Sequence, residues 1–202
     1  MRSAKVILSL IMIVGVYAQA DAFTLTFDDI PAGEVWREYY WQQYGVYFGY
    51  FYLADHSESS WGPPRSGINV LRCSTDNPLL AVVKFNHPDT GNPFSIYSLG
   101  AYFSTEPGVV VRMFSRDLYG NLVASVDIGS PGESWNNVYA EINSPEGSIR
   151  GVRFEGVSSP DALLHFAADD MTIVPVPEPS SLLALASGFL GLSGLALRRR
   201  RN

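Results

Sequence analysis

The sequence predicts an all-β body that folds as an antiparallel β-sandwich, and three observations support this prediction. Nine short runs rich in β-branched and aromatic residues recur along the chain, and the separators between them are rich in Gly, Pro, Asn and Ser. No segment of the body shows a convincing 3.6-residue apolar repeat, so no helix is expected there. The chain has 202 residues, enough for one well-packed domain and short terminal segments.

The predicted strands follow one another without an intervening helix. In the fifth run, Val111 and Met113 alternate with Arg112, as expected for a strand with one partly wet face. Gly120 and Asn121 then suit the positive φ of a tight hairpin turn into the sixth run. The nine runs cover residues 23–27, 45–53, 79–85, 95–103, 109–117, 122–128, 137–142, 149–156 and 163–174.

The charge of the chain is uneven. The formal net charge is −6, but the termini hold six of the 14 basic residues. Between residues 23 and 176, eight Lys or Arg stand against 18 Asp or Glu, a formal net charge of −10. An acidic body without a basic stripe argues against a nucleic-acid partner. The single cysteine, Cys73, has no internal disulfide partner and is expected to be a small buried thiol, with intermolecular pairing as the alternative.

The first 22 residues have the layout of a secretory signal peptide. Arg2 and Lys5 precede an apolar run from residue 6 to residue 16, and small residues follow. Two overlapping A-x-A sites predict cleavage after Ala20 or Ala22, and the sequence does not choose between them. A retained N-terminal anchor is the alternative, but about eleven apolar residues are too few to span a bilayer comfortably.

The C-terminal segment has the layout of a single transmembrane helix with a charged stop. Residues 182–197 are almost wholly apolar or small, so a membrane helix is expected over about residues 181–197. The arginines that follow are expected to stay cytoplasmic, which leaves the body outside the inner membrane. An ordinary tail anchor is one interpretation of this segment. The basic tail consists of Arg198, Arg199, Arg200 and Arg201.

A proline bracket stands just before this apolar run, at Pro177, Glu178 and Pro179. The bracket, the apolar run and the terminal arginine cluster together resemble the PEP-CTERM sorting signal of Gram-negative bacteria, a segment also called the ice-binding protein C-terminal domain. The resemblance implies recognition by exosortase, a membrane-embedded cysteine transpeptidase that cuts near the bracket. Exosortase would then pass the body to the cell surface or to an exopolysaccharide matrix.

This resemblance implies that the chain has three segments and is exported through a membrane-anchored precursor. The segments are a signal peptide (1–22), an ectodomain (23–174) and a sorting signal (175–202) that contains the PEP motif (177–179). The expected precursor is anchored in the inner membrane by its C-terminal helix, with its body in the periplasm. Whether the tail is then removed is left open by the sequence.

The body also resembles the galactose-binding-like or jelly-roll ectodomains that often precede such tails. The segments that carry this resemblance are "TLTFDDIP" at 24–31, "YGVYF" at 44–48, "DLYGNLV" at 117–123 and "HFAADDMTIV" at 165–174. The resemblance implies a jelly-roll-like variant of the predicted sandwich.

Aromatic residues are concentrated between residues 36 and 52, where ten of 17 residues are Trp, Tyr or Phe. One strand buries only alternate residues on each face, so some of these rings are expected at the surface. Exposed rings stack on the apolar faces of sugars, which makes Trp36 and Trp41 candidate glycan-binding residues and exopolysaccharide a candidate partner. Packing of the rings in the core and in loops is the alternative interpretation.

Two acidic pairs, Asp28-Asp29 and Asp169-Asp170, follow the first predicted strand and lie within the last one. The terminal strands of such sandwiches are commonly neighbours, and carboxylate oxygens are hard ligands that suit calcium. We therefore predict a structural Ca²⁺ site that uses Asp29 with Asp169 or Asp170. Solvated turn acids and caps are the alternative. No other cofactor is predicted.

Catalytic motifs are missing from the sequence. The histidines His56, His87 and His165 lack metal-ligand spacing, and no G-x-S-x-G motif is present. We therefore expect a non-catalytic surface or matrix component that binds glycan. A glycosidase needs only two suitably separated carboxylates, so a secreted hydrolase acting on extracellular polysaccharide is the alternative. An adhesive subunit without a small ligand is a third interpretation.

Overall fold

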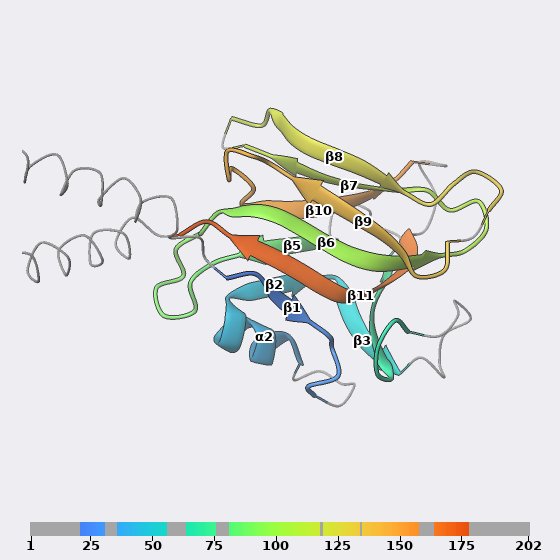
Figure 1. Cartoon of the computed structure of the whole chain (residues 1–202), viewed down its shortest axis with the longest axis horizontal. Helices are drawn as coiled ribbons and strands as arrows, with labels where there is room; N and C mark the ends of the chain where they lie inside the picture. Colours follow the sequence, from blue (N-terminus) through green and yellow to red (C-terminus); the bar gives the residue numbers. More distant parts are fainter. Residues whose placement is uncertain are drawn as a thin grey trace, which may run out of the picture. The chain divides into compact units, whose positions relative to one another are not determined.

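The body consists of two antiparallel β-sheets that pack face to face (Figure 1). The computed structural model describes residues 21–30, 36–55, 64–75, 81–117, 119–133, 135–157 and 164–177. The predicted all-β sandwich is therefore confirmed. Residues 1–20 of the predicted signal peptide, Glu178, Pro179, the apolar run and the basic tail lie outside the described residues. In the described part of the chain, no helix has the length and hydropathy of a membrane span.

One sheet has six strands, in the order β3-β4-β11-β6-β9, with β1 also paired to β11. On one edge of β11, residues 164–168 pair with β4 and residues 171–173 pair with β1. The other edge of β11 pairs with β6. The first and last strands are therefore neighbours, as predicted. The strands are β1 (Phe23–Leu25), β3 (Phe51–Asp55), β4 (Asn69–Thr75), β6 (Ile96–Thr105), β9 (Val138–Asn143) and β11 (Leu164–Pro175).

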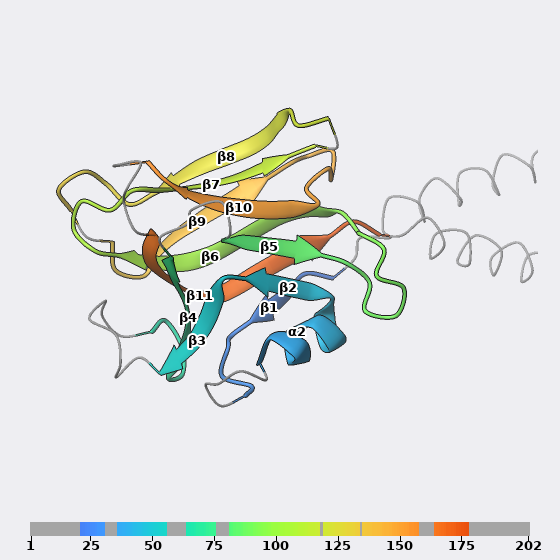
Figure 2. The same ribbon diagram turned by 180° about the vertical axis from the view of Figure 1, so that it is seen from behind.

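The other sheet has five strands, in the order β2-β5-β10-β7-β8, and faces the viewer in Figure 2. Among the strands that the structure describes, only the pairs β3–β4 and β7–β8 are consecutive within one sheet. Every other connection crosses between the sheets, as in a jelly-roll-like sandwich rather than two separate meanders. The strands are β2 (Val46–Gly49), β5 (Val82–Phe85), β7 (Val111–Arg116), β8 (Leu122–Ile128) and β10 (Gly151–Gly156).

The predicted hairpin at residues 109–128 is present as β7–β8. Gly120 has the expected positive φ of 85°. Asn121 does not share this positive φ. Its backbone N–H and its side-chain amide both donate to the carboxylate of Asp117, at 2.8 and 2.9 Å. These hydrogen bonds lower the pKa of Asp117.

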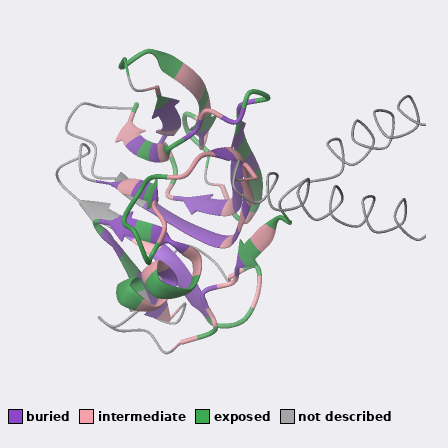
Figure 3. Ribbon diagram, turned by 90° about the vertical axis from the view of Figure 1, so that its left-hand side faces the viewer, coloured by how far each residue is buried: buried purple, intermediate pink, exposed green. Residues whose placement is uncertain are grey.

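The core lies between the two sheets, where Figure 3 shows the buried residues. Phe51 and Phe166 from the six-stranded sheet meet Phe154 from the five-stranded sheet, with ring centroids 5.5 Å (Phe51–Phe154) and 5.0 Å (Phe154–Phe166) apart. All three rings are fully buried. Such aromatic contacts add to the free energy gained by removing apolar area from water.

The prediction that the body lacks a helix is wrong at α2 (Trp36–Tyr44). Tyr40 is fully buried, Tyr39 and Tyr44 pack against the core, and Glu38 accepts a hydrogen bond from Gln42 at 3.0 Å. Tyr40 and Tyr44, and likewise Glu38 and Gln42, are four residues apart, which is a helical spacing. Because aromatic residues are more typical of strands than of helices, the composition of this segment hid its period.

The predicted strand 45–53 is two strands in two different sheets. β2 ends at Gly49 and β3 begins at Phe51, and Tyr50 between them has a φ of 57°. A positive φ bends the chain where a strand moves from one sheet to the other. β4 was not predicted at all, although Val70 and Arg72 alternate with Leu71 and Cys73 as in an ordinary strand.

Candidate functional site

The aromatic segment divides between the core and the surface. Tyr40, Phe48 and Phe51 are fully buried. The side chain of Trp36 lies outside the described residues and Trp41 is half-buried, so the predicted stacking role of both tryptophans stays a prediction. Among the side chains that the structure describes in this segment, three tyrosines are exposed, and residue alternation along β2 and β3 could have identified two of them, Tyr47 and Tyr52. The three tyrosines are Tyr47, Tyr50 and Tyr52, with exposed fractions of 41%, 54% and 36%.

Arginine side chains lie over tyrosine rings on the outer face of the six-stranded sheet. The guanidinium of Arg72 lies 5.3 Å from the ring centre of Tyr52, and that of Arg65 lies 4.9 Å from the ring centre of Tyr102. The Tyr102 ring in turn contacts Tyr139, with centroids 5.3 Å apart. These cation–π and aromatic contacts extend across β3, β4, β6 and β9.

Part of this outer face is covered by the protein itself. Val70 and Ala167 form a small cluster apart from the main core, and each is only 5% exposed. On β6, a Cβ at Gly100 would collide with the hydroxyl of Tyr139, so the Tyr139 ring occupies the space that a side chain at position 100 would need. The protein's own side chains therefore cover this face around Val70, Ala167 and Gly100, while the Tyr139 ring itself is 47% exposed.

Asp28 organises the segment that precedes β4. The backbone N–H groups of Ile68 and Asn69 donate to its carboxylate at 2.9 and 3.0 Å. The side-chain amide of Asn69 donates to the carbonyl of Phe27 at 3.2 Å, which closes the contact from the other side. Gly67 has a φ of 50°, and a Cβ there would collide with the Asp28 carboxylate, so this position requires glycine.

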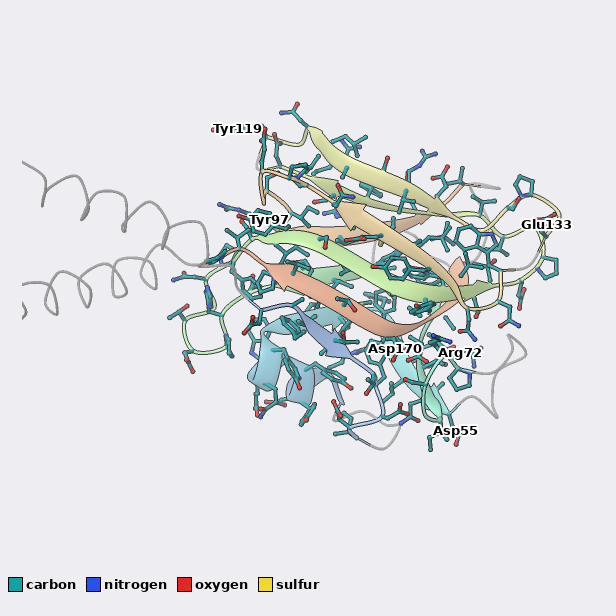
Figure 4. All side chains as sticks on the ribbon, in the orientation of Figure 1. Asp55, Arg72, Tyr97, Tyr119, Glu133 and Asp170 are labelled. Carbon is teal, nitrogen blue, oxygen red and sulfur yellow. The ribbon has the colours of Figure 1, made fainter. Side chains whose placement is uncertain are left out.

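Asp169 and Asp170 bind the same segment from β11. The backbone N–H of Ser66 donates to the Asp169 carboxylate at 2.9 Å, and the Ser66 hydroxyl lies 2.6 Å from the Asp170 carboxylate. Asp169 is only 2% exposed. Burial raises its pKa to about 6, and the charge of Asp170 adds to this effect, while backbone N–H donors oppose it. Figure 4 labels Asp170 on β11 in the region of Arg72.

A β-bulge places these two carboxylates. The register between β11 and β6 shifts between Asp169 and Thr172, and Asp170 has a φ of 47°. Ala168 and Met171 both face the core, although their positions differ by three, an odd number. The extra residue of the bulge absorbs this break in alternation, and aspartate tolerates the left-handed conformation better than most residues.

The predicted calcium ligands meet only in part. Asp169 and Asp170 bind the segment 66–69, and Asp28 binds the same segment. Asp29 is exposed. Burial raises the pKa of Tyr40 on α2, and the negative charge of Asp29 adds to this effect. Within the described ranges, no group of three or more His, Cys, Asp or Glu is arranged to hold a metal ion. The calcium site therefore stays a prediction.

Among the residues that the structure describes, Cys73 and His87 are not gathered into one site with the acidic residues. Cys73 faces the core, and burial raises the pKa of its thiol to about 12, so it stays protonated at neutral pH. His87 is half-buried with its ring 5.1 Å from that of Phe94. His56 and the side chain of His165 lie outside the described residues.

The fold and these surfaces define the body as a two-sheet β-sandwich module of jelly-roll-like connectivity. Residues 175–201 match the PEP-CTERM protein-sorting motif, which confirms the identification of the tail from its sequence. The match begins at Pro175, the last residue of β11. No curated protein sequence matches the chain significantly.

Several solved structures resemble the sandwich weakly. The K2 cleaved adhesin domain of Lys-gingipain is 13% identical with a TM-score of 0.49, over 76% of this chain and 99% of that one. An arabinose-bound α-L-arabinofuranosidase, MgGH51, is 13% identical with a TM-score of 0.46, over 78% and 27%. TmCBM61 in complex with β-1,4-galactotriose is 16% identical with a TM-score of 0.39, over 67% and 90%. At this level of similarity, none of them assigns a function to this chain.

Proposed function

We propose that this protein is exported, sorted by exosortase and delivered to the cell surface or to an exopolysaccharide matrix, where its sandwich is a non-catalytic component that binds glycan. The observation that carries the proposal is the sorting motif at residues 175–201. Because β11 ends at Pro175, a cut near Pro177–Pro179 would leave every described strand intact. The released body would therefore keep its fold.

The membrane topology of the precursor follows from the same tail. The apolar run holds the precursor in the inner membrane, and Arg198–Arg201 stay in the cytoplasm, so the sandwich folds in the periplasm. Exosortase then acts on the periplasmic side of the membrane helix, at the PEP motif.

Replacing the proline bracket tests the sorting step. In the native host, the double variant Pro177→Ala/Pro179→Ala is expected to accumulate as a membrane-bound precursor that extends through Asn202. A matched control, Ser180→Ala/Ser181→Ala, is expected to be released normally. Mass spectrometry of the C-terminus reads out both. Surface-located wild-type molecules that mostly retain the intact tail would contradict the proposal.

The burial of Asp169 supports the non-catalytic part of the proposal. A raised carboxyl pKa is typical of a general acid, but Asp169 is only 2% exposed and its oxygens accept hydrogen bonds from the backbone N–H groups of Ser66 and Asp170. An assay for reducing ends separates the two functions. Retention on polysaccharide without release of sugar agrees with a binding module, and reducing ends that accumulate with time identify a hydrolase.

The exposed tyrosines Tyr47, Tyr50 and Tyr52 support glycan binding, because exposed aromatic rings stack on the apolar faces of pyranoses. Measuring the retention of variants on polysaccharide tests whether these tyrosines or the two tryptophans bind the glycan. Tyr47→Ala is expected to weaken retention, and Trp36→Ala/Trp41→Ala tests the stacking role of α2. If the folded variant Trp36→Ala/Trp41→Ala is retained as well as the wild type, the tryptophans of α2 do not bind glycan and the binding residues lie on the sheets.

A further inference from the structure

Positive charge is concentrated on the outer face of the five-stranded sheet. This face carries four of the eight Lys and Arg residues between residues 23 and 176, although that stretch has a formal net charge of −10. The alternate residues Val83, Met113 and Val152 are fully buried in the core, so the residues between them face outward. The four cations are Lys84 on β5, Arg112 and Arg116 on β7, and Arg153 on β10.

The strand register brings these side chains together. Lys84 pairs with Tyr47 on β2 and with Gly151 on β10, and Arg153 lies opposite Phe114 on β7. Lys84 and Arg153 are diagonal neighbours on adjacent strands, roughly 7–8 Å apart by sheet geometry. These positions lie far apart in the sequence, which explains why the sequence showed no basic stripe.

Arg112 is neutralised by its neighbours, and the other three cations are not. Arg112 binds Asp127 at 2.8 Å and lies 3.9 Å from Glu155. Lys84 lies 5.9 Å from the Tyr47 ring centre, and Arg116 donates to the carbonyl of Gly120 at 2.7 Å. In the described part of the chain, no carboxylate forms an ion pair with Lys84, Arg116 or Arg153.

The residues around these cations leave them accessible to solvent. Gly151, beside Lys84, has no side chain, and the Tyr47 ring on the other side of Lys84 is 41% exposed. Lys84, Arg116 and Arg153 are all exposed. An aromatic ring for stacking thus adjoins donors that bind carboxylates. The ligand that matches both features is a sugar polymer that carries carboxylates.

We propose that this face, formed by Tyr47, Lys84, Arg116 and Arg153, binds an acidic polysaccharide such as a uronic acid polymer. The inference rests on the proposed glycan-binding function and names the class of glycan. The Tyr47 ring takes the apolar face of a sugar, and the three cations take its carboxylates. The net negative charge of the rest of the body repels polyanions, so binding by the body is confined to this face.

Binding to polygalacturonate tests this inference, with uncharged dextran as the reference polymer. The chain is used in detergent micelles with Arg198, Arg199, Arg200 and Arg201 replaced by Gln, so that the basic tail does not bind the polyanion. Affinity for polygalacturonate is expected to exceed that for dextran and to fall as salt rises, because exposed charges are screened. Arg153→Gln is expected to weaken binding about two- to fivefold, the size of one exposed ion pair. Lys84→Gln/Arg153→Gln is expected to weaken it about tenfold.

Arg65→Gln is the matched control, because it removes one positive charge from the outer face of the other sheet and is expected to leave affinity unchanged. Equal losses for Arg65→Gln and Arg153→Gln would overturn the site. Binding to dextran but not to polygalacturonate would overturn the inference and leave the glycan-binding function standing. Binding to neither polymer, with no retention on the native matrix, would contradict both. Far-UV circular dichroism checks that each variant is folded.

Discussion

The outer faces of the two sheets meet solvent in different ways. On the six-stranded sheet, Arg65 and Arg72 lie over tyrosine rings, and Val70 and Ala167 beneath them are almost fully buried. On the five-stranded sheet, the long cationic side chains stand exposed, and Arg112 alone among the four cations has carboxylate partners in the described ranges.

This difference shows that residue alternation distinguishes inside from outside but does not distinguish a covered face from an open one. The segment 64–68 covers part of the six-stranded sheet because Asp28, Asp169 and Asp170 hold it there. No comparable hydrogen-bonded cover is described over Lys84 and Arg153. We therefore expect the covered face to contribute to stability and the open face to binding.

Removing Asp28 is expected to have the largest effect. Asp28→Ala deletes the acceptor of two backbone N–H groups and should lower the free energy of unfolding by about 2–3 kcal/mol. Asp28→Asn keeps one acceptor oxygen and should cost less. Arg153→Gln, on the open face, should change stability by less than about 0.5 kcal/mol. Urea denaturation measures the free energy of unfolding of the three variants. Equal decreases for Asp28→Ala and Arg153→Gln would contradict the proposed difference between the two faces.

Asp169 should make the covered face sensitive to pH. Its pKa is about 6 in the folded protein and 3.8 ordinarily, so the folded state binds more protons between these values. The free energy of unfolding should therefore rise by on the order of 1 kcal/mol as pH falls from 7.5 to 5. This gain is lost as pH rises through 6. Melts of Asp169→Asn, which does not titrate, should lose this component. A wild-type curve with the same pH slope as the variant would contradict the prediction.

Adding calcium tests the same carboxylates, because Ca²⁺ favours their ionised form whereas low pH favours the protonated form. If the predicted site binds Ca²⁺, its charge favours the ionised form of Asp169, and a concentration of ten times Kd should add about 1.4 kcal/mol to stability. Melting temperatures in millimolar CaCl₂ and in chelator provide the measurement, with Asp170→Asn as the control variant. Identical melting temperatures in both solutions would remove the site.

The Arg112–Asp127 ion pair should give the smallest effect. Both side chains are partly exposed, at 39% and 47%, so Arg112→Gln is expected to cost no more than about 0.5 kcal/mol. The same variant should leave affinity for polygalacturonate within about twofold, because Arg112 is already neutralised. A loss as large as that of Arg153→Gln would mean that the acidic polymer displaces Asp127 from Arg112.

Local signals predicted much of the fold and little of the surface. The β7–β8 hairpin was visible because Gly120 and alternation over 111–116 act within a few residues of each other. The helix at 36–44 was missed because its ring positions carry the composition of a strand. That Asp28 rather than Asp29 binds the segment 66–69 was hidden for a similar reason: one residue decides which side of the chain a carboxylate faces, and Phe27 before them has a positive φ of 65°.

The sequence by itself determined the two-sheet class of the body and the sorting motif at residues 175–201, because alternation and terminal composition are properties of short segments. Tertiary structure alone decided that Tyr50 separates two sheets, that Asp28 shares a segment with Asp169, and that Lys84 lies beside Arg153. Each of these contacts joins residues distant in the chain, or depends on a bend or bulge that shifts the register. Such register is set by packing of the whole core rather than by any local pattern.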